Sequence, residues 1–410
     1  PPYDVLDEPA KARLQARHPN NIVTIDLPFT PPKSVGPDQV YEKAHITLQS
    51  WMSAGILAQD RRAAMYPYAQ TYEHHGKTFH RRGFIALVKL CPFGAGQIIP
   101  HEKTYKGPIE DRLKLMRATG VQSSPIFGLF SDTRGEINKL LYRGAGKPEM
   151  DGMLDGVRNQ LWSIIDADVE NQIIELMNAR PIHIADGHHR YTTALQYQAD
   201  LEQRHGGPLP INHPANWCMF VLVSMQDDGL LILPTHRLIG GLKSFNIDQF
   251  KSAVSGAFTV EPTPLTADKL ADYAHDILPS EPAHTFGLYD GTSKRLYRMT
   301  LKKPDLLADF EPNKSEAWRK LDVAILQRYL LDEILAPKFT DGEELARGFT
   351  AYGQEIAPMM NSGKYQIALL LKSTPLRALE DLGKHGEVMP QKSTFFVPKL
   401  ATGMVLNKLT

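Results

Sequence analysis

Residues 181–195 of this chain read PIHIADGHHRYTTAL, and this stretch decides the fold class. Residues 181–185 alternate their apolar side chains as a short buried strand does, and residues 188–195 place apolar side chains at helical spacing. The pattern therefore predicts a strand that runs into a helix through Asp186 and Gly187.

The predicted turn carries groups that suit a phosphate. Glycine lets the backbone turn sharply and approach a ligand closely. The first turn of a helix presents N–H groups that carry about half a positive charge, and His188, His189 and Arg190 add side-chain donors at the same point. We predict that Gly187 and the three residues after it bind phosphate. The alternative is a capped helix start with solvated polar side chains.

Length and composition limit the possible functions. A chain of 410 residues exceeds the usual size of a single core, so we expect two domains or one domain with a large insertion. Lys plus Arg and Asp plus Glu both number 46, so no net charge draws the protein to nucleic acid or to an anionic membrane. Cys91 and Cys218 lie in apolar surroundings, which favours buried thiols in a reducing compartment. A reducing compartment indicates a cytoplasmic protein, and no apolar run approaches the length of a membrane span.

Strand and helix patterns alternate through the first 240 residues. Strands are predicted at residues 22–27, 124–130 and 217–224, and helices at residues 38–57, 110–117 and 170–177. Residues 217–224 and 230–233 flank Asp227-Asp228-Gly229, which is typical of a hairpin turn. The alternation predicts an α/β fold with a mixed sheet.

The pattern changes from about residue 240 onward. Helices are predicted at residues 246–257, 266–277 and 318–335, and a hairpin at residues 285–289 and 295–301. This predicts a second α/β unit. We expect one domain at residues 1–240, a second at 241–375, and a C-terminal segment at 376–410 that returns to the first domain.

A second polar cluster follows the apolar pair at the start of residues 98–104, IIPHEKT. Glu102 would lie at a strand end beside His101 and Lys103, where a carboxylate can take a proton from a substrate hydroxyl. We assign Glu102 to catalysis and His101 and Thr104 to substrate binding. A loop ion pair is the alternative for Glu102.

Asp111 and Arg112 lie in the helix predicted at residues 110–117. Two interpretations fit these adjacent charges. They form either an exposed charged face or a clamp that supports the site from behind.

Residues 234–237 read PTHR and follow the second strand of the hairpin predicted above. Their side chains would be donors toward an anion at that strand end. We assign His236 and Arg237 to phosphate binding and Thr235 to substrate binding. The alternative is a polar triplet of the kind that many strand ends carry.

Residues 389–403, MPQKSTFFVPKLATG, are too apolar for a free tail. Lys392, Ser393, Thr394 and Lys399 would suit a phosphate group, and we assign both lysines to nucleotide binding. An edge strand with exposed lysines is the competing interpretation.

Five separated strings agree, in order, with one known family: PPYDV, IIPHEKT, ADGHHRYTTAL, LPTHRL and MPQKSTFFVPKLATG. With them the chain resembles, from end to end, the bacterial and archaeal family called domain of unknown function 1015 (DUF1015). The PHE string followed by DGHHR also resembles, more remotely, the ParB/sulfiredoxin fold and its free serine kinases. The resemblance implies a ParB/sulfiredoxin-like core.

The resemblance also implies roles for single residues. Free serine kinases of that fold use a glutamate on an earlier strand as base and a DGxHR turn for phosphate. Carried over, Glu102 is the base, Gly187, His189 and Arg190 form the phosphate site, and Asp186 takes part in catalysis by holding Mg²⁺. The implied cofactors are ATP or ADP with Mg²⁺, and the long spacing between Glu102 and Asp186 implies an insertion.

Three functions from different classes fit these observations. The first is a kinase that uses ATP or ADP to phosphorylate a small hydroxylated metabolite or amino acid, with free L-serine to O-phosphoserine as the leading reaction. The second is a ParB-like nucleotide-binding module without catalysis, for which the zero net charge disfavours nucleic acid as a partner. The third is a metal-dependent hydrolase that uses His101, His188, His189 and His236 with Glu102, although the chain has no HExxH spacing.

Overall fold

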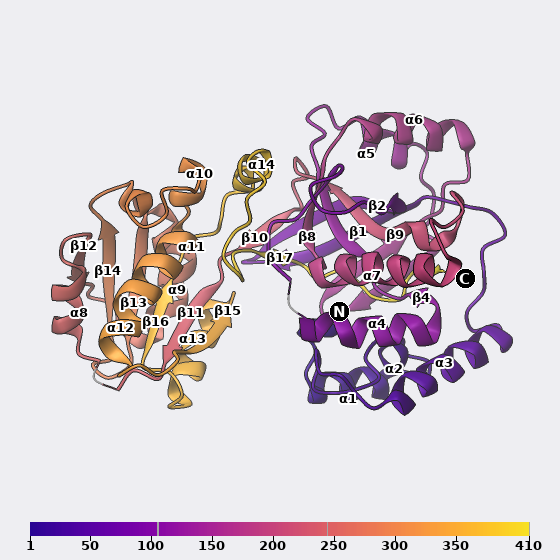
Figure 1. The fold of residues 1–410 in the computed structure, drawn as a ribbon. Coiled ribbons are helices and arrows are strands. Elements are labelled where there is room, and N and C mark those ends of the chain that lie inside the picture. Colours follow the sequence, from indigo (N-terminus) through magenta and orange to yellow (C-terminus); the bar gives the residue numbers. More distant parts are fainter. Residues whose placement is uncertain (105, 244, 410) are drawn as a thin grey trace. The chain divides into compact units, whose positions relative to one another are not determined.

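The computed structural model describes residues 1–104, 106–243 and 245–409, which form two compact units. Unit 1 comprises Pro1–Pro100, Thr104–Leu231 and Pro398–Thr410. Unit 2 comprises His101–Lys103 and Ile232–Val397. Each unit contains a β-sheet covered by helices (Figure 1). The chain therefore contains a second α/β unit, as predicted.

The sheet of unit 1 has eight strands in the order β3-β8-β5-β9-β2-β1-β7-β6. Their bounds are β1 Tyr66–His74, β2 Lys77–Lys89, β3 Ile98–Ile99, β5 Ile126–Phe130, β6 Met150–Leu154, β7 Val157–Leu161, β8 Ile182–Asp186 and β9 Trp217–Ser224. The pairs β3–β8 and β5–β9 are parallel, and β8–β5, β9–β2, β2–β1, β1–β7 and β7–β6 are antiparallel. This mixed sheet confirms the predicted fold class.

The main core of unit 1 lies between the sheet and three helices, α5 (Glu136–Leu141), α6 (Ala167–Asn178) and α7 (His188–His205). Ile137, Ile173 and Tyr191 bring these helices onto the sheet. A second cluster joins α2 (Val23–Asp26), α3 (Asp38–Ser53) and α4 (Lys106–Thr119). Unit 1 also contains α1 (Glu8–Arg17) and the short pair β4 (Val121–Gln122) and β18 (Asn407–Lys408).

The strand predicted at residues 22–27 is wrong, because this segment contains the short helix α2. Ile25 of α2 packs with Leu48 of α3 and Leu115 of α4. Asn21 accepts a hydrogen bond from the N–H of Val23 at 3.1 Å at the helix start. Packing against two helices thus outweighs the strand preference of Ile22, Val23 and Thr24.

The predicted hairpin of residues 217–224 with 230–233 is also wrong. β9 has β5 on one side and β2 on the other, so neither of its edges is free for a hairpin partner. β10 (Leu231–Leu233) pairs instead with β17 (Phe395–Val397). The predicted turn at residues 227–229 is present, since Asp227 accepts from the N–H of Gly229 at 3.0 Å, but a turn does not fix the strand that follows it.

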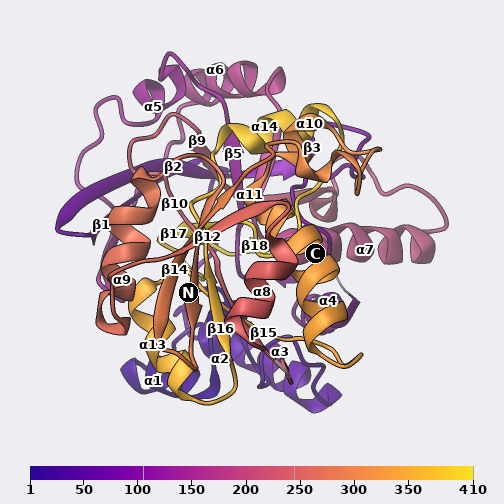
Figure 2. The same cartoon turned by 90° about the vertical axis from the view of Figure 1, so that its left-hand side faces the viewer.

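Unit 2 contains a six-stranded antiparallel sheet in the order β12-β14-β13-β16-β11-β15. The bounds are β11 His236–Gly240, β12 Phe258–Pro262, β13 Thr285–Asp290, β14 Arg295–Leu301, β15 Ala346–Thr350 and β16 Ile367–Leu370. Helices cover the sheet, among them α8 (Ile247–Val254), α9 (Leu270–Asp272), α12 (Ala336–Phe339) and α13 (Gly353–Asn361) (Figure 2). The chain also forms α10 (Glu316–Arg319), α11 (Asp322–Ala324) and α14 (Arg377–Lys384).

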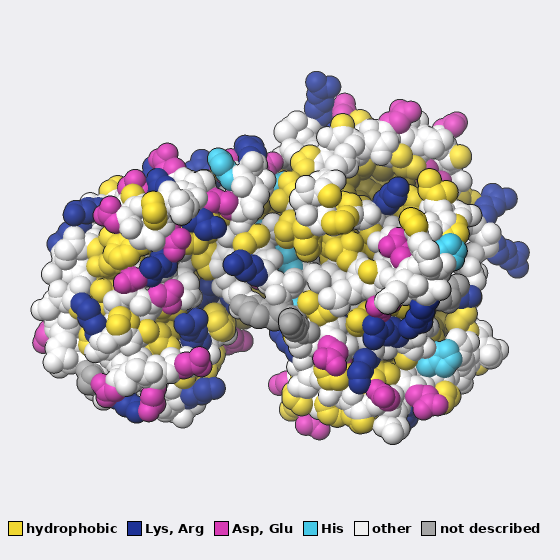
Figure 3. All heavy atoms as spheres, viewed as in Figure 1, with side chains coloured by type: hydrophobic (Ala, Val, Ile, Leu, Met, Phe, Trp, Pro, Cys, Tyr) yellow, Lys and Arg dark blue, Asp and Glu magenta, His cyan; other side chains and the backbone are white. Residues whose placement is uncertain are grey.

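The described surface carries charges of both signs. On the face seen in Figure 3, Lys and Arg side chains are interspersed with Asp and Glu side chains on each unit. This matches the equal numbers of basic and acidic residues. None of the described helices is both long enough and apolar enough to cross a bilayer.

Candidate functional site

The strand-turn-helix predicted around Asp186 is confirmed, since β8 ends at Asp186 and α7 begins at His188. Gly187 joins them with φ 98° and ψ 25° in the left-handed region. A Cβ atom at this position would lie 3.0 Å from three guanidinium atoms of Arg190. The left-handed backbone angle therefore favours glycine here, and a Cβ atom would require the Arg190 guanidinium group to shift.

Two cations approach the Asp186 carboxylate. Lys399 Nζ lies 2.9 Å from one oxygen, and an Arg190 guanidinium nitrogen lies 3.7 Å from the other. Burial alone would raise the pKa of Asp186, but the charges of Lys399, Arg190 and His188 outweigh burial and hold the pKa well below its usual range. Asp186 is therefore ionised at neutral pH. The turn thus places a carboxylate beside two side-chain cations, one of which comes from the C-terminal segment.

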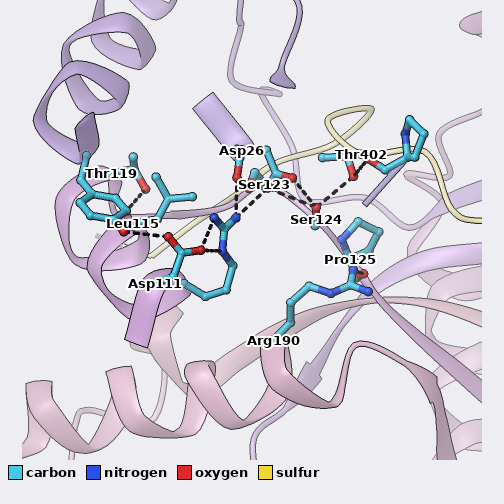
Figure 4. A network of polar contacts seen from close by, with 12 residues as sticks. Asp26, Asp111, Leu115, Thr119, Ser123, Ser124, Pro125, Arg190 and Thr402 are labelled. Carbon is cyan, nitrogen blue, oxygen red and sulfur yellow. Dashed lines mark hydrogen bonds and ion pairs between the residues drawn. The ribbon is translucent and has the colours of Figure 1, made fainter. Parts of the chain in front are cut away.

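A buried polar network holds the guanidinium group of Arg190 through the backbone at Pro125 (Figure 4). Its guanidinium group donates a hydrogen bond to the carbonyl oxygen of Pro125. The preceding residue, Ser124, lies 3.3 Å from both carboxylate oxygens of Asp26 and 3.0 Å from the hydroxyl of Thr402. The network holds the Ser124–Pro125 backbone and, through it, the guanidinium group of Arg190.

Asp111 and Arg112 belong to the same network and are buried, so the exposed-face interpretation is wrong. Arg112 donates to Asp111 at 2.8 and 2.6 Å and also donates to the carbonyl oxygen of Asp26. The hydroxyl of Tyr41 donates to Asp111 at 2.7 Å. The pair therefore ties α4 to α2 and α3 and supports the network from within unit 1.

A small pocket of unit 1 borders this network. Asp26, Arg112, Ser124 and Arg190 supply polar walls, and Leu115 and Ile126 are among the apolar residues that line it. Arg190 therefore contributes both to the turn and to the pocket.

Unit 2 brings together two stretches that the sequence analysis singled out separately. The carboxylate of Glu102 accepts a hydrogen bond from the N–H of Ser393 at 3.3 Å and lies 3.9 Å from His101 Nε2. The same imidazole nitrogen lies 3.0 Å from the hydroxyl of Thr394. The side chains of Glu102 and His101 are therefore held by the tail segment that contains Ser393 and Thr394.

Thr235, His236 and Arg237 do not form the open strand end that was predicted. All three are buried, and His236 and Arg237 begin β11. His236 Nδ1 accepts from the N–H of Leu371 at 3.1 Å, and burial lowers the pKa of His236 to about 3, so the ring is neutral. Arg237 donates to the carbonyl oxygens of Thr235 and Gln391. The strand-end prediction failed because residues 236–240 form β11, which is paired on both sides, with β16 and with β15.

The remaining predicted site residues lie in both units. Lys399 belongs to unit 1, whereas Lys392 belongs to unit 2, where it is exposed and has a φ of 56°. Thr104 belongs to unit 1 and precedes α4. The two lysines that we assigned to the same phosphate group are therefore carried by different units.

Mg²⁺ in proteins is usually held by one or two carboxylates together with water and phosphate oxygens. The oxygens of Asp186 are engaged by Lys399 and Arg190, so a metal ion at this carboxylate requires that Lys399 first leave. This arrangement does not fit a resident metal ion. Among the described residues, no group of three or more His, Cys, Asp or Glu side chains could hold one. The geometry thus gives no support to the metal-dependent hydrolase.

Three residues near the turn were not predicted from the sequence: Asp26, Gln70 and Arg81. Asp26 contacts Ser124, whereas Gln70 and Arg81 contact the backbone of residues 398–399. Gln70 and Arg81 face each other on β1 and β2 and are buried in unit 1. Strand alternation alone assigns such residues to a solvated face. Nothing in the sequence indicates which backbone covers them.

Comparison with known proteins identifies a family. The chain matches the model described as "Protein of unknown function (DUF1015)" over residues 1–324. No curated protein matches it.

Several solved structures match at low similarity. A free serine kinase in complex with AMP is 12% identical with a TM-score of 0.35, and the match covers 76% of this chain and 87% of that chain. A conserved hypothetical protein from Pyrococcus furiosus is 14% identical with a TM-score of 0.36, covering 79% and 95%. SbnI with C-terminal truncation from Staphylococcus aureus is 12% identical with a TM-score of 0.37, covering 78% and 85%. Similarity at this level transfers no site residue.

Proposed function

We propose a function for this chain, which belongs to the DUF1015 family of proteins of unknown function: it is a nucleotide-dependent kinase that phosphorylates the hydroxyl group of a small metabolite. ATP or ADP is the donor, and free L-serine is the first acceptor to test. The nucleotide phosphates bind at residues 187–190 of unit 1, with Lys399 beside them.

One observation carries the proposal: Arg190 and Lys399 both reach Asp186 at the start of the 18-residue helix α7. A helix start attracts anions through its N–H groups and its dipole. Two cations held at that point are suited to phosphate oxygens. The carboxylate of Asp186 keeps the two side chains close together when no phosphate is bound.

Phosphoryl transfer needs little covalent help from a protein but needs positioning and positive charge around the transferring group. In the proposal, Arg190 and Lys399 supply that charge. Glu102 takes the proton from the substrate hydroxyl, and His101 and Thr104 contact the substrate, as the sequence predicts. His236 and Arg237 have no part in the proposed phosphate site, because both are engaged within unit 2.

The first experiment measures nucleotide binding. ATP, ADP and CTP are titrated by calorimetry, with and without Mg²⁺, into the wild type and into Arg190→Ala. Loss of one charge-assisted hydrogen bond should weaken binding by about 1.5–3 kcal/mol. Arg204→Ala is the matched control, because Arg204 is exposed near the other end of α7. Equal affinity for wild type and Arg190→Ala contradicts the proposed phosphate site.

The second experiment measures turnover. The protein is incubated with ATP or ADP and with L-serine or a panel of hydroxylated metabolites, and the products are identified by mass spectrometry. Formation of a phosphorylated acceptor supports the kinase. Nucleotide binding without any phosphorylated product favours a binding module without catalysis instead.

A further inference from the structure

A short C-terminal segment brings Lys399 to the turn. Residues 398–402, called the C-terminal strap here, belong to unit 1 although the chain leaves this unit at Leu231 and returns only at Pro398. The strap contributes no strand to the large sheet. Its position in unit 1 therefore depends on other contacts.

Side chains of the β1–β2 hairpin hold the strap on both sides of Lys399. Arg81 donates to the carbonyl oxygen of Pro398 at 2.7 Å, and Gln70 donates to the carbonyl oxygen of Lys399 at 3.1 Å. The hydroxyl of Tyr68 accepts from the N–H of Ala401 at 3.2 Å. Three successive anchors thus fix the backbone from which the Lys399 side chain extends.

Two of these anchors, Gln70 and Arg81, form one buried hydrogen-bonded pair. Gln70 and Arg81 are direct cross-strand partners, and they also hydrogen bond to each other. Arg81 is only 2% exposed and lies over the Phe127 ring, 4.7 Å from its centroid. Removing a guanidinium group from water is costly, and hydrogen bonds to the strap offset part of that cost. Burial also lowers the pKa of Arg81 to about 10, which still leaves the group charged at neutral pH.

We propose that Arg81 and Gln70 are positioning residues that hold the strap so that Lys399 reaches the turn at Asp186. A lysine side chain has many rotamers, and ordering them costs free energy. A fixed backbone lowers this entropic cost, because only the side-chain rotamers of Lys399 must then be ordered for the amine to reach Asp186. The positioning of Lys399 by Gln70 and Arg81 follows from the contacts alone. Its role in nucleotide binding rests on the proposed function.

The test uses Arg81→Met and Gln70→Met, with Lys399→Met as the reference. Loss of the anchor should free the strap, so hydrogen exchange at the Ala401 amide should become at least about tenfold faster in both anchor variants. The pKa of Asp186, followed by NMR, should rise in Arg81→Met in the same direction as in Lys399→Met, because the carboxylate loses the same cation. Arg82→Met is the matched control, since Arg82 is the next residue on β2 and is exposed.

Nucleotide affinity supplies the functional readout. Arg81→Met and Lys399→Met should each weaken ATP binding by about tenfold to a hundredfold, and the double variant should be no weaker than Lys399→Met alone. Additive losses, or an Asp186 pKa that stays unchanged in both anchor variants, overturn the positioning role. If Arg81→Met does not fold, Gln70→Met decides the question, because it removes the amide that donates to Lys399 without removing a charge. If the wild type binds no nucleotide, the proposed function fails, and the exchange and pKa measurements still decide the role of the anchors.

Discussion

Gly187 combines a left-handed backbone with a close approach of the Arg190 guanidinium group. Replacement by alanine should therefore cost about 1–2 kcal/mol of unfolding free energy from backbone strain and should also displace Arg190. We expect Gly187→Ala to lower both stability in urea and nucleotide affinity by calorimetry.

Gly206 provides a matched control for this prediction. It ends α7 with a φ of 81°, but a Cβ atom there would meet nothing within 4 Å. Gly206→Ala should lose comparable stability while binding nucleotide normally. Equal binding by both variants would show that the approach of Arg190 to Gly187 does not matter for the ligand.

Asp186 offers a test at the same scale that needs no nucleotide. Its pKa is held below the usual value because Lys399, Arg190 and His188 outweigh burial. The stabilisation from these charges is present above the usual carboxyl pKa and disappears only as pH falls through the lowered value. We expect the carboxyl resonance of Asp186 to titrate below the usual carboxyl pKa in wild type, and the pKa to rise in Lys399→Met. An unchanged pKa in that variant contradicts the ion pair.

At the scale of elements, β11 buries an imidazole ring in unit 2. Burial, with His275 and Arg237 nearby, lowers the pKa of His236 from 6.5 to about 3. Between these values the unfolded chain binds a proton that the folded protein does not, so stability should fall as pH decreases from about 6.5.

His236→Asn should remove this dependence, because an asparagine oxygen can still accept from the N–H of Leu371. We expect thermal unfolding at pH 5 to be closer to that at pH 7 in the variant than in wild type. His18, an exposed residue of unit 1, gives the control variant His18→Asn. An equal loss of stability in wild type and His236→Asn would contradict the assignment.

Local elements were predicted well where one pattern sufficed. β9 at Trp217–Ser224 has the predicted bounds, and the turn at Asp186 and Gly187 joins a strand to a helix as predicted. The wrong predictions concern segments whose secondary structure or strand pairing depends on residues far away in the sequence. Helix α2 depends on α3 and α4, and β10 depends on β17, more than 160 residues later along the chain.

At the scale of the whole molecule, the family is the one that the five strings indicate, whereas the partners of the site residues do not follow from sequence. Lys399 and Asp186 are 213 residues apart, and Ser393 and Glu102 are 291 apart. Periodicity reports only on neighbours within one element. The sequence could therefore identify Lys399 and Glu102 as candidate site residues but could not predict which groups they contact.

Glu102 carries the prediction that concerns the complete reaction. A general base typically contributes about 10²–10⁴-fold to a rate, and it need not contribute to nucleotide affinity. Glu102→Gln keeps the shape of the side chain and an oxygen that can accept from the N–H of Ser393, so unit 2 should stay folded. We expect turnover with ATP or ADP to fall by about 10²–10⁴-fold while the affinity for nucleotide stays nearly unchanged.

The matched control for this prediction is Glu344→Gln, since Glu344 is an exposed glutamate of the same unit. Rates are measured by mass spectrometry of the phosphorylated acceptor, and thermal unfolding verifies that both variants are folded. The proton must leave the acceptor hydroxyl as the new P–O bond forms, so removal of the base should slow the chemical step rather than binding. A folded Glu102→Gln protein as active as wild type rules out Glu102 as the base and leaves phosphate binding at residues 187–190 to be judged on its own experiment.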